Sequence, residues 1–389
     1  MIKIIFSIIF FVIPALLFWF DVVFSFKKSI IHFHIGKWDS DVSWEKAVYK
    51  KASSWNKYMP KVRIDDKKKY ELISIVKRKN SDKSVQSWQN GMLNLGLFEY
   101  EIKERNFIDS KKYLVKFISN SGQWKFEVNR IDYALLAYSI LKVCDNKLEF
   151  IKPAMDEVIE VIEKNICTDG MVSYSQGADT VFRYVDTLGM VCPFLALYGK
   201  KYNDEKYIQL AIDQIRKFRE NGVLADYALP CHAYNGTSFI PFGIYGWGRG
   251  TAWYFLAIVD TWRELDSSES KNFLAGLMLE AATKYVQFQQ SDGGFLSILQ
   301  GGGQYDSSVT AAMAYLYKVC GMVFNRQDFL DVHFKCLRKI KSVTMKSGAI
   351  DLCQGDTHGI GVFSRDFDIM PFAQGLVLRA LSFRKDLVK

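Results

Sequence analysis

The sequence predicts an all-α protein, an (α/α)6 barrel preceded by one N-terminal transmembrane helix. From about residue 43 onward, apolar residues recur at three- and four-residue spacing, which is the period of an amphipathic helix. Alternating, strand-like patterns are scarce, and Asn, Gly and Asp residues cluster in the gaps between helical stretches. Helix pairs also recur at a weak interval of roughly fifty residues, which is typical of repeat architectures.

About twelve helices are expected, and no low-complexity linker divides them. One antiparallel pair is too thin to bury its own apolar face, so six consecutive pairs can close into a ring around a shared core. An open helical solenoid is the alternative. The periodic stretches are residues 43–57, 84–101, 109–119, 131–144, 148–164, 183–199, 204–219, 249–265, 270–289, 307–320, 327–341 and 370–383.

Residues 4–20, IIFSIIFFVIPALLFWF, are uncharged and mostly apolar, and residues 22–26 could lengthen the stretch past Asp21. This length is at the short end of a membrane-spanning helix. No small-residue cleavage site follows, so we expect an uncleaved, single-pass anchor in a bacterial inner membrane. The side of the membrane stays open. Free thiols and the following basic segment favour the cytoplasm, whereas Lys3 and the N-terminal amine favour the opposite side.

The formal net charge of +9 is concentrated in one segment. Residues 27–83 contain 16 Lys and Arg against 7 Asp and Glu, so the rest of the chain is balanced. The segment is either a set of solvated helix faces or a surface attracted to an anionic membrane or an acidic glycan. No nucleic-acid motif accompanies the charge, so nucleic acid is not an expected partner. We divide the chain into an anchor (1–28), a basic juxtamembrane segment with the first helices (29–83) and the barrel (84–389).

Seven cysteines are scattered singly, and none forms a CxxC pair. This spacing supports neither a zinc site nor a thioredoxin-type site. Several of these cysteines lie in apolar helical contexts, which is typical of small buried hydrophobic residues. The chain also has no phosphate-binding loop motif. We therefore expect no metal and no organic cofactor.

Alternate helices carry a polar or aromatic residue at or near their start. If these helices form the inner ring with their N-termini at one mouth, the six side chains converge on one cleft. The six residues are Trp88, Asp132, Asp186, Arg249, Asp306 and Gln374.

Asp186 lies in the run FRYVDTLGMVCPFLALYG, residues 182–199, which is otherwise almost wholly apolar. A carboxylate in such a setting is costly to bury unless it is paired or used. Burial would raise its pKa and keep it protonated near neutral pH, as a general acid requires. The alternative is that Asp186 caps the start of a core helix that is kinked at Pro193.

Five stretches resemble, in the same order, motifs of the unsaturated glycuronyl hydrolases, glycoside hydrolase families 88 and 105. The central stretch, YVDTLGMVCPFLALYGKKYNDEKYIQLAIDQI, is similar to their W-x-D-x-L-x-M-x-x-P-F-L-A-like run, and GWGRGTAWYFLAI resembles their WGRGNGW motif. The others are SWQNGMLNLGLFEY, RIDYALLAYSIL and QYDSSVTAAMAYLY. The resemblance runs from about residue 84 to 384, and it implies an (α/α)6 barrel.

The resemblance also implies an unusual reaction. These enzymes hydrate the C4–C5 double bond of an unsaturated uronic acid at the non-reducing end of an oligosaccharide. The resulting hemiketal rearranges and releases the rest of the chain. One Asp acts as general acid and base, and Asp186 matches its position; a second Asp assists, and Asp132 matches that one. The alternative for Asp132 is a helix N-cap.

Substrate-binding candidates surround these two carboxylates. The guanidinium of Arg249 is suited to bidentate capture of a uronate carboxylate, or else to a structural ion pair. Trp247, Trp253 and Trp88 could each stack on a sugar ring or simply pack in the core. His232 resembles a His in the family's loop before the WGR motif, although a lone His is more often structural. The remaining candidates are Asp306, Gln374 and His358, the last of which shares a late Gly-rich loop with Asp356.

Several positions depart from the family pattern in the predicted cleft. Gly189 stands where a bulky residue is usual, and Thr251 replaces the usual Asn. Asp306 stands in place of Glu, and Gln374 in place of a common Asp. The anchored form resembles VpsJ-like barrel proteins of bacterial exopolysaccharide and surface-antigen clusters, which implies a role in making or trimming a cell-surface glycan.

Three functions follow from these observations. The first is a membrane-anchored enzyme of the unsaturated glycuronyl hydrolase type, acting on a uronate-containing polysaccharide or its fragments. The second is a non-catalytic glycan-binding or assembly factor in exopolysaccharide, O-antigen or capsule biosynthesis. The third is a different carbohydrate enzyme on the same barrel, because fold alone does not separate these chemistries.

Overall fold

The computed structural model describes residues 8–16, 18, 19, 22, 23, 26, 35–63, 82–104, 111–144, 147–175 and 180–383. Part of the predicted anchor and the basic runs at residues 67–69 and 77–79 lie outside these residues. Within the anchor, η1 (Ile8–Val12) is a π-helical turn. In the part of the chain that the structure describes, α13 (Ser307–Phe324) has the length and hydropathy of a membrane span, but 78% of it is buried in the protein. We therefore assign α13 to the core.

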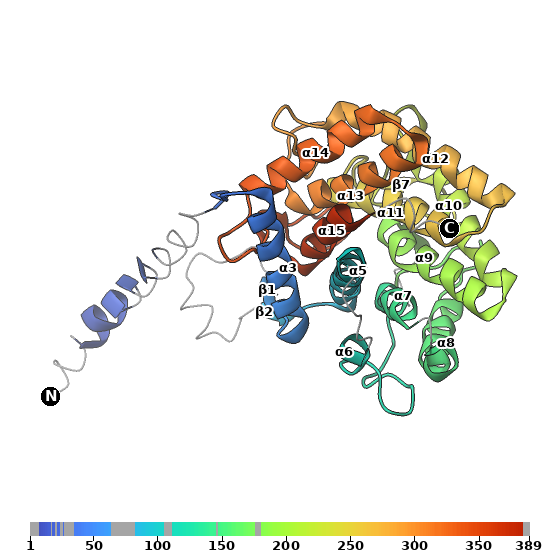
Figure 1. Ribbon diagram of the computed structural model, residues 1–389, viewed down its shortest axis with the longest axis horizontal. Helices are drawn as coiled ribbons and strands as arrows, with labels where there is room; N and C mark the ends of the chain where they lie inside the picture. The colour runs from blue at the N-terminus through green and yellow to red at the C-terminus, as the bar shows by residue number, and fades with distance from the viewer. Residues whose placement is uncertain are drawn as a thin grey trace.

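Six helices form a closed inner ring (Figure 1). Each inner helix packs against the next, and the last packs against the first, so the predicted barrel is confirmed and the open solenoid is wrong. These helices are buried on nearly every side, because they contact both their neighbours in the ring and the helices outside it. The inner helices are α5 (Ser87–Lys103), α7 (Tyr133–Val143), α9 (Val185–Tyr202), α11 (Gly248–Glu264), α13 and α15 (Pro371–Ser382).

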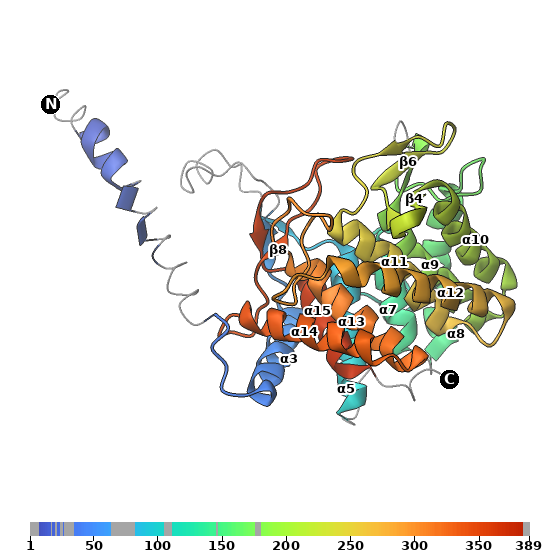
Figure 2. The ribbon, with the colours of Figure 1, turned by 90° about the horizontal axis from the view of Figure 1, so that it is seen from above.

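Outside this ring, a second set of helices from residues 41–342 forms an outer layer (Figures 1 and 2). Most bury a single apolar stripe and expose the opposite face, as the periodicity of the sequence predicts. One differs: among the described residues of the stretch 109–119, the α-helix covers Lys111–Leu114, and the chain then turns at residues 119–122 so that Ile118 bridges to Trp124. The outer helices are α3 (Asp41–Lys57), α6 (Lys111–Leu114), α8 (Leu148–Lys164), α10 (Glu205–Asn221), α12 (Glu269–Tyr285) and α14 (Gln327–Ser342).

Short antiparallel strands, which the all-α prediction did not include, precede several inner helices. One sheet joins β3 (Phe182–Tyr184), β6 (Ala233–Asn235) and β7 (Pro241–Phe242), with Arg183 opposite Tyr234 and Tyr234 opposite Pro241. Because β3 leads into α9 and β7 precedes α11, this sheet lies over the N-terminal ends of the inner helices. The other strands pair as β1 (Lys61–Arg63) with β2 (Asp82–Ser84), β4 (Val223–Leu224) with β5 (Leu229–Pro230), and β8 (Cys353–Gln354) with β9 (Phe367–Asp368).

The ring closes at a seam between α5 and α15 that requires glycine. A Cβ on Gly96 would lie 2.2 Å from the carbonyl oxygen of Gly375, and a Cβ on Gly375 would lie 2.2 Å from that of Met92. Such distances are far below van der Waals contact, so any side chain here would push the first and last inner helices apart. The two glycines therefore set how closely the ring closes.

A buried network of charges links the inner helices across the barrel. Arg379 is fully buried and donates to both oxygens of Asp260, at 2.7 and 2.8 Å, and to Glu99 at 3.2 and 3.3 Å. Arg263 donates to Glu99 at 2.8 Å, and both guanidinium groups reach the hydroxyl of Tyr315. Burial alone would raise the pKa of Glu99, but Arg263 and Arg379 lower it to about 2. The network thus connects α5, α11 and α15 through paired charges and joins α13 through the Tyr315 hydroxyl.

We expect Arg379→Met to destabilise the barrel by about 3–5 kcal/mol, because it leaves the buried Asp260 carboxylate without its bidentate partner. Lys164→Met is the matched control, since it breaks an exposed pair with Glu160 on α8 and should change stability by less than about 1 kcal/mol. Urea unfolding followed by circular dichroism measures both. A similar midpoint for the two variants would show that the network does not stabilise the fold.

Candidate functional site

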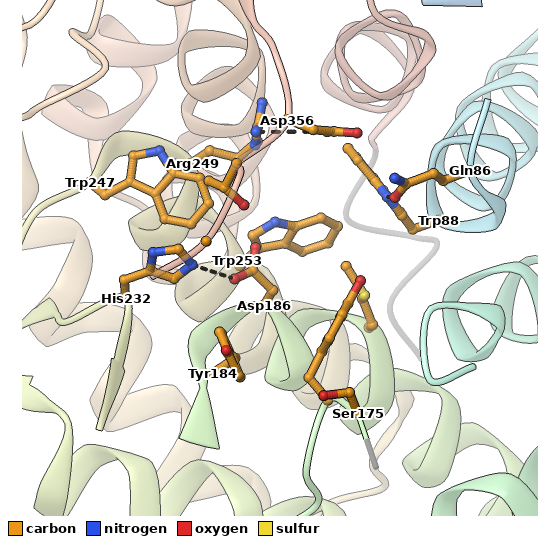
Figure 3. A pocket seen from close by; sticks show the side chains of 14 residues that line it. Gln86, Trp88, Ser175, Tyr184, Asp186, His232, Trp247, Arg249, Trp253 and Asp356 are labelled. Atoms are coloured by element: carbon orange, nitrogen blue, oxygen red, sulfur yellow. Dashed lines mark hydrogen bonds and ion pairs between the residues drawn. The ribbon is translucent and has the colours of Figure 1, made fainter. Parts of the chain in front are cut away.

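A cavity of about 300 Å³ lies at the N-terminal ends of the inner helices (Figure 3). Trp88, Asp186 and Arg249 occupy the first turns of α5, α9 and α11. Successive inner helices run in the same direction, so these first turns meet at one mouth of the barrel. The cavity is lined by Gln86, Trp88, Tyr174, Ser175, Tyr184, Asp186, Met190, His232, Trp247, Arg249, Trp253, Asp356, Thr357 and Gly359.

The structure brings together most of the residues that the sequence predicted for this cleft. Those lining the cavity are Trp88, Asp186, His232, Trp247, Arg249 and Trp253. Those not lining it are Asp132, Asp306, His358 and Gln374. The sequence did not single out Tyr184, at the end of β3, or the lining residues that come from loops, such as Tyr174 and Thr357.

Asp186 places a carboxyl group at the cavity. Its side chain is 16% exposed and lies 3.6 Å from His232, measured from Oδ2 to Nε2. Burial raises the pKa of Asp186 to about 7, although Arg249 acts in the opposite direction, and Asp356 adds to the increase. The N-cap position of α9 belongs to Tyr184, whose side chain makes no capping hydrogen bond. Asp186 can therefore hold a proton near neutral pH while it faces the cavity.

His232 is held in one orientation and one protonation state. Its Nδ1 accepts a hydrogen bond from the Gly361 N–H at 3.2 Å, so the proton of the neutral ring is on Nε2. Burial, with the charge of Arg249, lowers the pKa of His232 to about 4, so the ring is neutral at neutral pH. The ring packs against Trp247 and Phe363, with centroids 4.6 and 5.5 Å away. The Nε2–H therefore points toward Asp186 (Figure 3).

Trp88 and Trp253 form an aromatic wall with Phe372 of α15. The two indoles meet edge to face with centroids 5.6 Å apart, and Phe372 lies 5.2 Å from Trp88 and 4.8 Å from Trp253. Gly189 explains how Trp253 fits, because a Cβ there would lie 2.4 Å from the Trp253 ring. The unusual glycine in the Asp186 motif thus gives the indole its space. An indole face at a cavity is a surface on which a sugar ring can stack.

Arg249 and two neighbours hold the chain that follows β8. Arg249 donates to the carbonyl oxygens of Gln354 and Gly355 at 2.5 and 2.7 Å. Trp247 donates from its indole nitrogen to the Gln354 side chain at 3.1 Å, and the Gln354 N–H donates to Asp306 at 3.1 Å. Arg249 of α11 and the N-cap residues of α11 and α13, Trp247 and Asp306, therefore fix the path of residues 354 and 355, and this path brings Asp356 to the cavity.

Asp356 is a second carboxyl group of the cavity, and the sequence noted it only as part of a Gly-rich loop. Its side chain is 15% exposed, and Oδ1 lies 3.9 Å from Nη2 of Arg249 (Figure 3). Burial raises the pKa of Asp356, while Arg249 acts to lower it. Nothing in the spacing of the sequence marks this Asp, because its position depends on the path of the loop.

The four remaining candidates have other contacts. Asp132 is 1% exposed and its carboxylate is bound by Arg130 through two hydrogen bonds. Its charge raises the pKa of Tyr174, after the larger effect of burial, so it lies near the cavity without lining it. Asp306 is the N-cap of α13 and accepts from Ser308. His358 is exposed on the loop after Asp356.

Gln374 is fully buried and acts within the framework of the protein. Its amide nitrogen donates to the carbonyl oxygens of Val48 and Gly348, at 2.9 and 2.8 Å, and its oxygen accepts from the Ile350 N–H at 3.2 Å. These bonds join α15 to α3 and to the turn after α14. The structure therefore gives Gln374 structural contacts rather than a place at the cavity.

No group of three or more His, Cys, Asp or Glu side chains that could hold a metal ion occurs among the residues that the structure describes. The seven cysteines are free thiols, and all except Cys167 are buried. The cavity thus offers carboxyl groups, a guanidinium, a neutral imidazole and indole faces. This combination suits proton transfer to a ring that stacks on an aromatic wall.

A family model described as Glycosyl Hydrolase Family 88 matches residues 55–382. No curated protein is similar enough in sequence to match the chain. Solved structures share the fold. One from Salmonella enterica serovar Paratyphi A, described as a possible member of family 105, is 15% identical, with a TM-score of 0.70 over 89% of this chain and 95% of that one.

Two further solved structures share this fold. A possible family 105 member from Klebsiella pneumoniae is 16% identical, with a TM-score of 0.69 over 89% of this chain and 94% of that one. An unsaturated glucuronyl hydrolase from Bacillus sp. GL1 is 16% identical, with a TM-score of 0.62 over 88% of this chain and 96% of that one. The matched family model spans most of the chain, including every residue that lines the cavity. The protein therefore belongs to Glycosyl Hydrolase Family 88.

Proposed function

We propose that this protein hydrates the C4–C5 double bond of an unsaturated uronyl residue at the non-reducing end of an oligosaccharide. The observation that carries this proposal is Asp186, a buried carboxyl group with a pKa near 7 at an aromatic-walled cavity. Membership of Family 88 supports a glycoside hydrolase. The solved relative from Bacillus is named an unsaturated glucuronyl hydrolase that degrades glycosaminoglycan, which supports this substrate class.

The side chains of the cavity suit each step of the reaction. Protonated Asp186 donates its proton to C4 of the enol ether, and positive charge develops at C5 and the ring oxygen. A water molecule adds to C5 and gives its proton to the Asp186 carboxylate, which restores the acid. The product is a hemiketal, which opens to a ketone and releases the rest of the oligosaccharide as an alcohol. Each turnover consumes one water and leaves Asp186 unchanged.

The neighbours of Asp186 position the reactants. The Nε2–H of His232 can donate to Asp186 or to a substrate oxygen, while Trp253 supports the sugar ring. Arg249 keeps guanidinium N–H groups at the cavity beyond those that hold Gln354 and Gly355, and these can bind the uronate carboxylate. The assisting role proposed for Asp132 would act through its charge on Tyr174, since Arg130 holds its carboxylate.

We further propose that the substrate comes from a uronate-containing bacterial surface polysaccharide and that residues 4–20 anchor the barrel in the inner membrane. The uncharged, apolar sequence of this segment supports the anchor. The basic segment that follows suits an anionic membrane surface.

A second candidate is ordinary hydrolysis of a glycosidic bond, which Asp356 favours. Inverting and retaining glycosidases use two carboxyl groups that flank the bond. Asp186 and Asp356 line the same cavity, and the charge of each raises the pKa of Tyr174 there. A non-catalytic glycan-binding factor is the third candidate, because an aromatic-walled cavity with buried polar groups can also serve recognition alone.

We expect Asp186→Asn to lower kcat by at least about 100-fold on 4,5-unsaturated uronyl disaccharides, because the amide cannot donate the proton. The ultraviolet absorbance of the double bond disappears on hydration and reports the reaction directly. Disaccharides prepared from several polysaccharides serve as substrates. Asp266→Asn, at an exposed carboxylate beyond the far end of α11, is the matched control and should keep full activity.

The other candidates give different results in the same experiment. Release of reducing sugar from saturated oligosaccharides, without loss of absorbance from unsaturated ones, would identify ordinary hydrolysis. Binding of glycan by both parent and Asp186→Asn, with no turnover of either substrate class, would identify a binding factor and reject the hydration reaction.

The pH dependence of kcat/KM should follow the raised pKa of Asp186. The acid form is active, so kcat/KM should be highest below about pH 7 and fall about tenfold for each unit above it. His232 stays neutral throughout, because its pKa is lowered to about 4. Initial rates across a series of buffers measure the profile. A rate that rises through neutral pH would contradict Asp186 as the proton donor.

The anchor is tested by fractionation of cells that produce the full chain or residues 35–389. We expect the full chain to stay with membranes after alkaline carbonate washing and to dissolve only in detergent, because a spanning helix is not removed by charge changes. The shorter chain should be found in the supernatant. Release of the full chain by carbonate would leave only electrostatic attachment through the basic segment.

A further inference from the structure

Asp356 lies in the wall between two cavities. On one side is the cavity that contains Asp186 and Arg249. On the other is a smaller cavity of about 10 Å³, whose lining includes Gln89, Asp366 and Asp368. A side chain in such a wall can be directed to either side by a change of rotamer.

On the side of the larger cavity, Asp356 lies beside Arg249, the guanidinium group that would bind a uronate carboxylate. Its Oδ1 is 3.9 Å from Arg249 Nη2, whose other bond goes to the carbonyl oxygen of Gly355. The distance is longer than a hydrogen bond, so the two charges attract each other without a fixed bidentate geometry. A substrate carboxylate that approaches Arg249 meets a second negative charge. Binding therefore requires Asp356 to move or to become neutral.

On the smaller side, Gln89 offers an unused amide. Gln89 belongs to the first turn of α5 and is fully buried. Neither its side-chain nitrogen nor its oxygen has a hydrogen-bond partner among the described residues. A buried amide without partners is costly, and such groups call for an explanation. Asp356 also lines this cavity, so a rotamer that turned its carboxyl group away from Arg249 would bring that group toward the Gln89 amide.

The charges around Asp356 make this second position suited to its protonated form. Burial raises the pKa of Asp356, Asp132 adds to the increase, and Arg249, His358 and Arg130 oppose it. On the smaller side, two further carboxyl groups replace the guanidinium as neighbours. A protonated carboxyl can donate to the Gln89 oxygen and accept from its nitrogen. The charged and titratable groups around Asp356 in the two cavities and their surroundings are Arg130, Asp132, Tyr174, Asp186, Arg249, Cys353, His358, Asp366 and Asp368.

We propose that Asp356 is a specificity-determining residue, which competes with the carboxylate of a uronyl substrate for Arg249 and turns toward Gln89 when that carboxylate binds. The inference rests on the proposed function, because it assumes that a uronate enters the cavity. Beyond that function, the Asp356 carboxylate of the protein limits the affinity for uronate. The cavity thus discriminates against uronates most strongly when Asp356 is ionised.

Asp356→Asn tests the competition by direct binding. We expect the variant to bind sodium glucuronate about tenfold more tightly than the parent at about pH 8, because the competing charge is gone. The gain should shrink at about pH 5.5, where Asp356 of the parent is more often neutral. Methyl glucoside, which lacks the carboxylate, should bind equally to both. Quenching of tryptophan fluorescence reports binding, because Trp88, Trp247 and Trp253 line the cavity.

Two further variants separate competition from a general change of charge. Asp266→Asn removes an exposed carboxylate beyond the far end of α11, outside both cavities, and it should leave glucuronate affinity unchanged. Gln89→Met keeps the volume of the side chain and removes the amide, so glucuronate should bind about threefold more weakly. In the Asp356→Asn background the same Gln89 substitution should have a smaller effect, since the charge no longer needs to leave Arg249.

The outcomes distinguish this inference from the proposed function. Tighter binding by Asp356→Asn supports the competition even if the parent hydrates no unsaturated uronide. Equal affinities of parent and variant, or no binding of glucuronate by either, would overturn it even if hydration is observed. A kcat that falls more than about 100-fold in Asp356→Asn with unchanged affinity would instead place Asp356 in the chemical step.

Discussion

The closed ring depends on charge pairs that are buried between its inner helices. Arg379 lies on α15, the last helix of the ring, and binds Asp260 of α11 and Glu99 of α5. A buried charge that lost its partner would be expensive, so these helices are constrained to keep one mutual arrangement. The Gly96–Gly375 seam then lets α5 and α15 approach each other closely. Ring closure has a functional consequence, because it brings the first turns of α5, α9 and α11 around one cavity.

At that mouth of the barrel, hydrogen bonds from side chains to the backbone, rather than charge pairs, hold the loop in place. Arg249 uses two of its donors on the carbonyl oxygens of Gln354 and Gly355. The loop that carries Asp356 is therefore attached to the same guanidinium that would receive a uronate. Asp306, which the sequence suggested as a cleft residue, contributes by holding the N–H of Gln354. Its role in the site is to shape the loop rather than to reach a ligand.

The sequence predicted the helices well, because periodicity reports burial directly, and it selected Asp186 because a charge within an apolar run is unusual. It did not separate a buried polar side chain at the cavity from one in the framework. Gln374 begins an inner helix as Asp186 does, yet its amide binds backbone groups of residues 48, 348 and 350. Asp356 could not be selected, since its place depends on hydrogen bonds from residues more than a hundred positions away. Local pattern gives the elements, and contacts between distant segments decide which polar residues meet.

The two ends of the barrel show how one fold gives carboxyl groups opposite properties. Glu99 and Asp186 are both buried on inner helices, and burial raises the pKa of each. Two guanidinium groups contact Glu99 directly and lower its pKa to about 2, so it stays ionised and structural. Asp186 makes no direct ion pair with Arg249, whose charge lowers its pKa by less than burial raises it, and the pKa of Asp186 rises to about 7. The raised pKa of Asp186 at the mouth therefore follows from the absence there of the direct charge pairing that keeps Glu99 ionised.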